Sequence, residues 1–154
     1  MKITFIGHSD FVPTEKIEEQ LQNILENLPR DEKIEFYLGG YGNFDIFAKK
    51  CCKKYQVLNK SAKLYLVSPY LTPSFLNSIK NQSKDYDQII TFKSAEKPRK
   101  YTIIKRNYEM ISLADLIISY VDFSFGGAYK SFIYAIKQKK HIVNLGSLEV
   151  EKGD

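Results

Sequence analysis

Two glycine-rich loops, each directly after a strongly apolar run, place the tightest constraint on how this chain folds. Residues 39–43 follow the apolar residues 34–38, and residues 126–127 follow an apolar stretch that begins at Leu116. Each pattern predicts a buried strand, a tight turn and the start of a helix. Such a turn lies at the carboxyl end of a parallel strand, where unpaired helix amides hold phosphate or sugar groups. Two of them predict one nucleotide-shaped cleft.

The rest of the chain continues this alternation. Strands are predicted at residues 2–6, 33–38, 63–70, 86–92, 115–121 and 141–145, and helices at residues 14–28, 43–55, within 71–85, 100–112 and 127–139. Thr14 and Asn43 are expected to cap the first two helices. The polar segment 93–100 contains Pro98 and is expected to be a loop and a candidate lid. Residues 1–154 are therefore predicted to form one α/β domain, Rossmann-like, with a mostly parallel sheet and helices on both faces.

The net charge of +5 is unevenly distributed, with −3 over residues 1–50 and +8 over residues 51–154. A basic balance favours an anionic partner. No lysine cluster alternates with aromatic residues as single-strand binders require, so nucleic acid is expected only as a secondary partner. The chain has 11 Tyr and 10 Phe, more than its core can hold, which predicts a homo-oligomer.

The first apolar run is too short for a signal-peptide core, and none approaches the roughly 18 residues of a membrane span. We therefore expect a cytoplasmic protein with no membrane partner. Cys51 and Cys52 lie within a helical pattern, which suits neither a disulfide between neighbours nor a structural zinc site. We expect core thiols, with no metal and no cofactor. His141 is expected to begin a buried strand in a structural role.

The first glycine loop and its helix are a candidate ligand site. The loop residues are Gly39, Gly40, Tyr41, Gly42 and Asn43. Glycines allow positive φ and close approach of an anionic group to the backbone. Asp45, in the first helical turn, has two interpretations: it stabilises the helix start through the helix dipole, or it holds ribose and stabilises charge during N-glycosidic cleavage.

Three other segments supply further candidates. Ser124, Gly126, Gly127 and Lys130 form a second anion-binding candidate, in which the alternative is a tight turn with an exposed lysine. Arg106, next to Asn107, is a candidate phosphate clamp or a residue of a surface helix. Gly7, His8 and Ser9 end the first strand, where a parallel sheet places them between the two loops. Ser9 and His8 do not form a catalytic triad, because a third orienting group and a nucleophile elbow are missing.

Taken together, these motifs resemble the SLOG superfamily. They are Gly-His after the first strand, Gly-Gly-Tyr-Gly-x-Phe-Asp at 39–45, Arg-Asn-x-x-Met at 106–110, Ala-Asp-Leu-Ile-Ile-x-Tyr at 114–120, Gly-Gly at 126–127 and Ile-Val-Asn-Leu at 142–145. The similarity is closest to a small uncharacterised bacterial and phage branch, and more distant to the LOG phosphoribohydrolases and DNA-processing protein A. It implies a Rossmann-like domain that binds nucleotides or nucleotide-derived signals.

The chain departs from the phosphoribohydrolases at the second loop. Their pattern, Gly-Gly-x-Gly-Thr-x-x-Glu, supplies a catalytic carboxylate. In this chain Tyr129 and Lys130 replace the Gly and Thr, and Ile133 stands at the Glu position. The resemblance thus implies a phosphate cradle without its catalyst, so any hydrolysis would depend on Asp45.

We therefore expect a protein that binds a nucleotide-derived small molecule, such as an ADP-ribose species or a cyclic nucleotide, as a sensor or a sequestering protein. Two alternatives stay open. One is an N-glycosidase or phosphoribohydrolase that uses Asp45 on a nucleoside monophosphate or NAD-like substrate. The other is single-stranded nucleic-acid binding through the basic later part of the chain.

Overall fold

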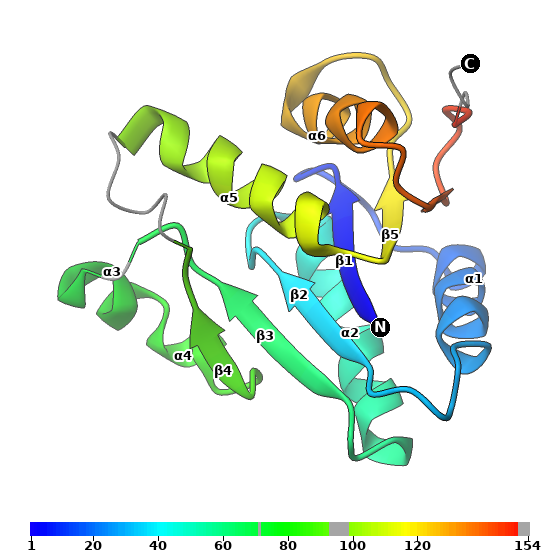
Figure 1. Cartoon of the computed structure of the whole chain (residues 1–154), viewed down its shortest axis with the longest axis horizontal. Coiled ribbons are helices and arrows are strands. Elements are labelled where there is room, and N and C mark those ends of the chain that lie inside the picture. The colour runs from blue at the N-terminus through cyan, green and yellow to red at the C-terminus, as the bar shows by residue number, and fades with distance from the viewer. Residues whose placement is uncertain (71, 93–98, 151–154) are drawn as a thin grey trace.

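The computed structural model describes residues 1–70, 72–92 and 99–150. Within these residues are the strands β1 (Lys2–Gly7), β2 (Glu35–Leu38), β3 (Lys63–Val67), β4 (Gln88–Ile90), β5 (Leu116–Tyr120) and β6 (Ile142–Asn144). The helices are α1 (Glu15–Glu26), α2 (Asn43–Leu58), α3 (Pro73–Ser78), α4 (Lys80–Ser83), α5 (Arg99–Leu113) and α6 (Gly126–Lys137). Strands and helices alternate along the chain, as the apolar pattern predicts (Figure 1).

The strands form one sheet in the order β4-β3-β2-β1-β5-β6, and every described pair is parallel. From β1 the chain proceeds outward through β2, β3 and β4. It then returns through α5 to β5, on the other side of β1 (Figure 1). The predicted Rossmann-like α/β fold is thus confirmed. The order of the strands reverses between β1 and β5, which makes this junction the topological switch point.

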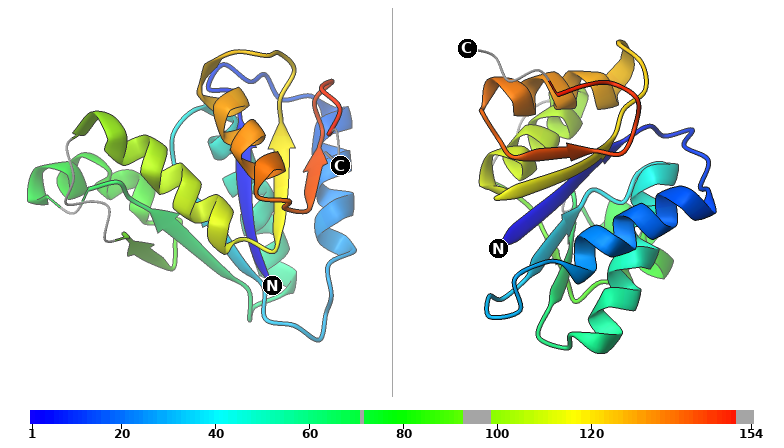
Figure 2. Two further views of the ribbon diagram at one scale, coloured as in Figure 1. Left: turned by 45° about the horizontal axis from the view of Figure 1, so that its top comes forward. Right: turned by 90° about the vertical axis from the view of Figure 1, so that its right-hand side faces the viewer.

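Helices cover both faces of the sheet, with α1 and α2 on one side and α5 and α6 on the other (Figure 2). The central strand β1 shows why its apolar residues form a buried parallel strand. Ile3 and Phe5 pack into the cluster that includes α1 and α2, whereas Ile6 packs with residues of α5 and α6. A strand buried on both faces has a continuous apolar run, and residues 3–6 are all buried.

Several local predictions are confirmed. Thr14 caps α1, where its hydroxyl accepts a hydrogen bond from the amide of Ile17 at 3.2 Å. Such a cap contributes about 1 kcal/mol. Cys51 and Cys52 are free and buried in the core, and burial raises the pKa of the Cys51 thiol to about 11. None of the described helices is long and apolar enough to cross a membrane.

Other local predictions are wrong. Gly42, with φ +89°, is the N-cap of α2, so Asn43 is the first helical residue and makes no side-chain cap. Its amide instead donates to the carbonyl of Ser9 at 3.0 Å. Two short helices, α3 and α4, replace one helix within 71–85. His141 precedes β6 and is exposed. Of the predicted lid, residues 93–98 lie outside the described residues, and Arg99 already begins α5.

Candidate functional site

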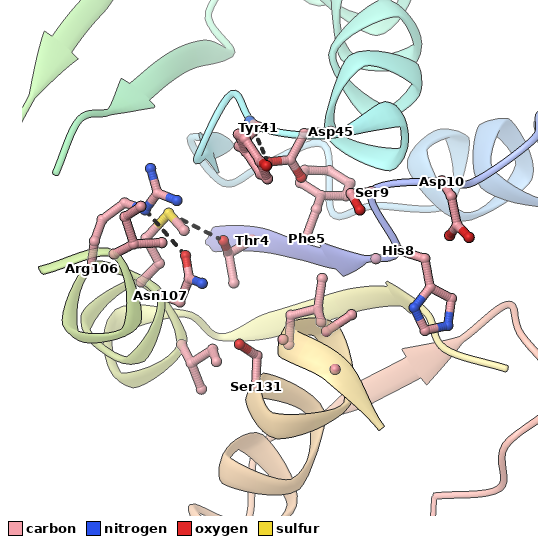
Figure 3. Close-up of a pocket in the computed structure, with 18 of the residues that line it drawn as sticks. Thr4, Phe5, His8, Ser9, Asp10, Tyr41, Asp45, Arg106, Asn107 and Ser131 are labelled. Carbon is pink, nitrogen blue, oxygen red and sulfur yellow. Dashed lines mark hydrogen bonds between the residues drawn. The ribbon is translucent and has the colours of Figure 1, made fainter. Parts of the chain in front are cut away.

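A cavity of about 410 Å³ opens at the switch point, a size typical of sites for small ligands. Figure 3 shows how four parts of the chain converge on it. They are residues 4–10 of β1 and the loop after it, the start of α2, the side of α5 and the turn that leads into α6. This is where doubly wound folds bind ligands.

The structure separates the predicted site residues into two groups. Nine of them line the cavity: Gly7, His8, Ser9, Tyr41, Asp45, Arg106, Asn107, Gly126 and Gly127. The other six do not: Gly39, Gly40, Gly42, Asn43, Ser124 and Lys130. The residues of the second group lie in the two predicted loops but do not reach the cavity. A parallel sheet also places the end of the predicted strand 63–70 at this edge, but residues 68–70 do not line the cavity.

The glycines of the first loop are required by packing. A Cβ on Gly39 would lie 3.0 Å from the guanidinium carbon of Arg106. A Cβ on Gly42 would lie 2.8 Å from the Cα of Ser9, and one on Gly40 would lie 2.6 Å from the side chain of Leu66. Gly40 and Gly42 also have positive φ, which glycine adopts without cost. The glycines of this loop pack against neighbouring residues, so they leave no space in which a phosphate group could bind.

The second turn is open. A Cβ on Gly126 or Gly127 would have no heavy atom of the described residues within 4 Å. Both residues line the cavity at the N-terminus of α6, and the N-cap residue Phe125 makes no side-chain hydrogen bond to the helix. The first amides of a 12-residue helix thus face an open space beside the cavity. Unpaired amides and the helix dipole favour an anion there.

Asp45 faces the cavity from the first turn of α2. Its Oδ2 accepts a hydrogen bond from the amide of Tyr41 at 3.2 Å, so the carboxylate also closes its own loop. Burial raises the pKa of Asp45 to about 6, although the amides of Tyr41 and Gly40 and the charge of Arg106 act in the opposite direction. A carboxyl group with this pKa exchanges protons readily near neutral pH.

Arg106 is not on the surface of α5 but buried, with 6% of its area exposed. Its Nη1 donates to the carbonyls of Gly39 and Val67 at 3.0 and 3.2 Å, and its Nε donates to Oδ1 of Asn107 at 3.1 Å. It therefore joins α5 to the ends of β2 and β3. The surface interpretation of Arg106 is wrong, and the charge is held at the wall of the cavity.

His8 combines a structural and a lining role. Its Nε2 accepts a hydrogen bond from the amide of Asp122 at 2.9 Å, which leaves the proton of the neutral ring on Nδ1. The ring stacks on Phe123 with centroids 3.8 Å apart, and Phe123 stacks on Phe125 at 4.3 Å. Phe125 and Tyr41 also line the cavity, and they are 68% and 75% exposed. Flat aromatic faces are thus available at the mouth for stacking.

Sequence reasoning missed several lining residues, among them Thr4, Ile103, Met110, Phe123, Phe125 and Ser131. Most are apolar, and of these only Met110 belongs to a motif of the sequence. Ser131 is one helical turn beyond Gly127, so a search for polar residues at i+4 from the glycine turn would have found it. Ile133 stands at the position of the phosphoribohydrolase glutamate. It is partly buried against the apolar cluster formed by residues of the sheet, α5 and α6. The described residues contain no group of three or more His, Cys, Asp or Glu able to hold a metal ion.

Comparison with known proteins relates the fold to two solved structures. One is DNA processing protein A from Helicobacter pylori, in a study of its single-stranded DNA binding mode. The two structures match with a TM-score of 0.62 and 19% sequence identity, over 100% of this chain and 68% of that one. The other is DNA processing protein A from Streptococcus pneumoniae, with a TM-score of 0.63 and 12% identity, over 98% of this chain and 52% of that one. No protein-family model matches the chain, and no curated protein is significantly similar to it. The chain therefore shares the Rossmann-like α/β fold of DNA processing protein A.

Proposed function

We propose that this protein binds a nucleotide or a nucleotide-derived signal in the switch-point cavity, as a sensor or a sequestering protein. One observation carries the proposal: the open glycines Gly126 and Gly127 present the N-terminus of α6 to the cavity. A phosphate group bound there accepts hydrogen bonds from the unpaired amides. The fold of DNA processing protein A and the motifs of the sequence also support membership of the SLOG superfamily.

The other walls of the cavity suit the rest of such a ligand. Asp45 accepts hydrogen bonds from ribose hydroxyls, and the Nδ1–H of His8 is a donor for a base or sugar. The exposed rings of Tyr41 and Phe125 offer stacking surfaces for the base. An apolar pocket with a few convergent polar groups is the usual form of a nucleotide site.

The test is thermal unfolding against a panel of nucleotides, in the wild type and in the variants Gly127→Asp and Gly127→Ala. A ligand at 100 times its Kd stabilises the protein by about 2.7 kcal/mol. We expect Gly127→Asp to lose this stabilisation, because its carboxylate occupies the phosphate position. An added methyl group in open space leaves Gly127→Ala able to bind. Equal binding by Gly127→Asp, or no shift with any nucleotide, contradicts the proposal.

Single-stranded DNA binding is a second candidate, favoured by the fold shared with DNA processing protein A. The exposed rings of Tyr41 and Phe125 and the net charge of +5 are consistent with it. Base stacking on aromatic side chains contributes about 1–3 kcal/mol per base. Fluorescence anisotropy with a labelled oligonucleotide tests this candidate. Affinity is expected to fall steeply as salt rises and to weaken in Phe125→Ala. Binding that salt leaves unchanged is incompatible with it.

Hydrolysis of an N-glycosidic bond is the remaining candidate, and the pKa of about 6 at Asp45 favours it. A carboxyl group that titrates near the working pH acts well as an acid or a base. Chromatography of nucleotides incubated with the protein detects any released base. Release that Asp45→Asn abolishes supports the hydrolase. The absence of release from nucleoside monophosphates and NAD excludes it.

A further inference from the structure

A second polar cluster lies deeper in the cavity, away from the N-terminus of α6. It consists of Arg106 and Asn107 from α5 and Ser131 from α6, on the side of the sheet where these two helices meet (Figure 3). Asp45 approaches from α2, on the other side of the cavity mouth (Figure 3). The hydrogen-bonding character of this cluster determines what it can bind.

The cluster presents mostly donors to the cavity. Nε of Arg106 donates to Oδ1 of Asn107 at 3.1 Å. Because a guanidinium is a donor only, this bond fixes the orientation of the amide and leaves Nδ2 of Asn107, with its two hydrogens, for other partners. Nη2 of Arg106 makes no hydrogen bond to any residue that the structure describes, since its bonds come from Nε and Nη1. The complementary group is therefore rich in acceptors.

The charge of Arg106 indicates that the acceptor-rich group is an anion. Arg106 is 6% exposed, and among the described residues no carboxylate lies within 4.0 Å of it. Two backbone carbonyls and an amide satisfy part of its hydrogen bonding, and the carboxyl group of Asp45 acts on its charge from beyond salt-bridge distance. A buried cation with no carboxylate in direct contact is costly, so an anion that enters this part of the cavity relieves part of that penalty.

Ser131 is a second, independent reason to expect an anion in this part of the cavity. It is 6% exposed and lines the cavity, and its hydroxyl makes no hydrogen bond within the described part of the chain. Many helical serines donate to the carbonyl four residues earlier. This one faces the cavity instead (Figure 3). No fully buried polar side-chain atom of the described residues lacks a partner, so the hydroxyl of Ser131 is reached from the cavity. Ser131 lies four residues after Gly127, which is about 6 Å along the helix axis.

We infer that Arg106, Asn107 and Ser131 form a second oxyanion subsite, so that the ligand is a nucleotide with two phosphoryl groups. One group binds at the N-terminus of α6 and the other binds between α5 and α6, about one helical turn away. This inference rests on the proposed nucleotide site and specifies its ligand. A nucleoside monophosphate fills only one of the two subsites.

Isothermal titration calorimetry with matched ligands and variants tests the inference. The ligands are AMP, ADP and adenosine 3′,5′-bisphosphate, which separate a diphosphate from two phosphates at different positions. We expect at least one two-phosphoryl ligand to bind roughly 10-fold or more tightly than AMP. Ser131→Ala should weaken that ligand roughly 10-fold, because a hydrogen bond to a charged group is lost. Ser124→Ala, an exposed serine outside the cavity lining, is the matched control and should change nothing.

Asn107→Asp is the second variant. Its carboxylate still accepts from Nε of Arg106, so the protein should remain folded, but it repels a phosphoryl group. We expect a loss of roughly 100-fold for the two-phosphoryl ligand, with an unchanged or higher Tm. Equal affinity for all three ligands, or equal effects of Ser131→Ala on AMP and on the tighter ligand, overturns the second subsite and leaves the nucleotide site standing. Binding of none of them by the wild type overturns both.

Discussion

The two glycine loops look alike in the sequence but differ in the folded protein. In the loop at 39–42, a side chain would collide with Leu66 at Gly40 or with Ser9 at Gly42, and would press closely on Arg106 at Gly39. In the turn at 126–127, a side chain would point into open space beside the cavity. The first loop needs glycine to pack, and the second is free to admit a ligand. A glycine pair after a strand therefore predicts a turn, but only its surroundings indicate a binding site.

The loops differ in charge as well. The first carries Asp45, whose carboxylate bonds to its own loop and faces the cavity. The second has no acid in its first helical turn, and Ile133, at the position of the phosphoribohydrolase glutamate, is partly buried against the core. One loop thus presents an acceptor to the cavity, and the other presents amide donors. Variants in each loop test this difference in packing and charge.

The largest effect is expected for Gly42→Ala. Its Cβ would lie 2.8 Å from the Cα of Ser9, at a φ of +89° that alanine rarely adopts. Overpacking and backbone strain together should lower the free energy of unfolding by about 3 kcal/mol. Urea unfolding monitored by circular dichroism measures this. A loss below about 1 kcal/mol would mean that the first loop has room to yield and is not packed as described.

Asp45→Asn should have the next largest effect, and the effect should depend on pH. The folded-state pKa of Asp45 is about 6, against an ordinary value of 3.8. Between these values the folded protein retains a proton that the unfolded chain has released, so the contribution of this group to stability falls as pH rises and is constant above pH about 7. Asparagine keeps the acceptor for the amide of Tyr41 and removes the charge.

The variant should therefore be more stable than the wild type at pH 7, by on the order of 2 kcal/mol, and similar to it near pH 4. Urea unfolding at both pH values provides the comparison. Parallel pH profiles for the two proteins would show that Asp45 titrates normally and that its carboxylate is well hydrated.

The smallest effect is expected for Gly127→Ala, the counterpart of Gly42→Ala. Beyond its chain neighbours and the backbone of α6, no described atom lies within 4 Å of the new Cβ, and the residue is helical with no positive φ. Alanine costs less backbone entropy than glycine, so stability should stay the same or rise by up to about 1 kcal/mol. Gly126→Ala is the control within the same turn, because its φ of +88° should make it destabilising despite the open space. Equal effects of the two would contradict the described turn.

Much of the architecture was predictable, because apolar periodicity reports burial directly. The largely apolar runs of β1 and β5 indicate strands covered on both faces, and Thr14 before an amphipathic pattern marks the start of α1. Local boundaries were less predictable. Asn43 is a good cap by residue type, but Gly42 takes that position because the loop turns through a positive φ and Ser9 accepts the amide of Asn43.

By itself, the sequence determined the parallel α/β order and brought Asp45, His8, Arg106 and Gly127 to one edge of the sheet, since parallel strands end on the same side. Only the tertiary structure decided what each does there. In the folded protein the glycines of the first loop pack against neighbours, those of the second face open space, Arg106 is buried with no described carboxylate within 4.0 Å, and Ser131 lines the cavity. Burial and free volume depend on contacts between distant segments, and residue types along a chain do not encode them locally.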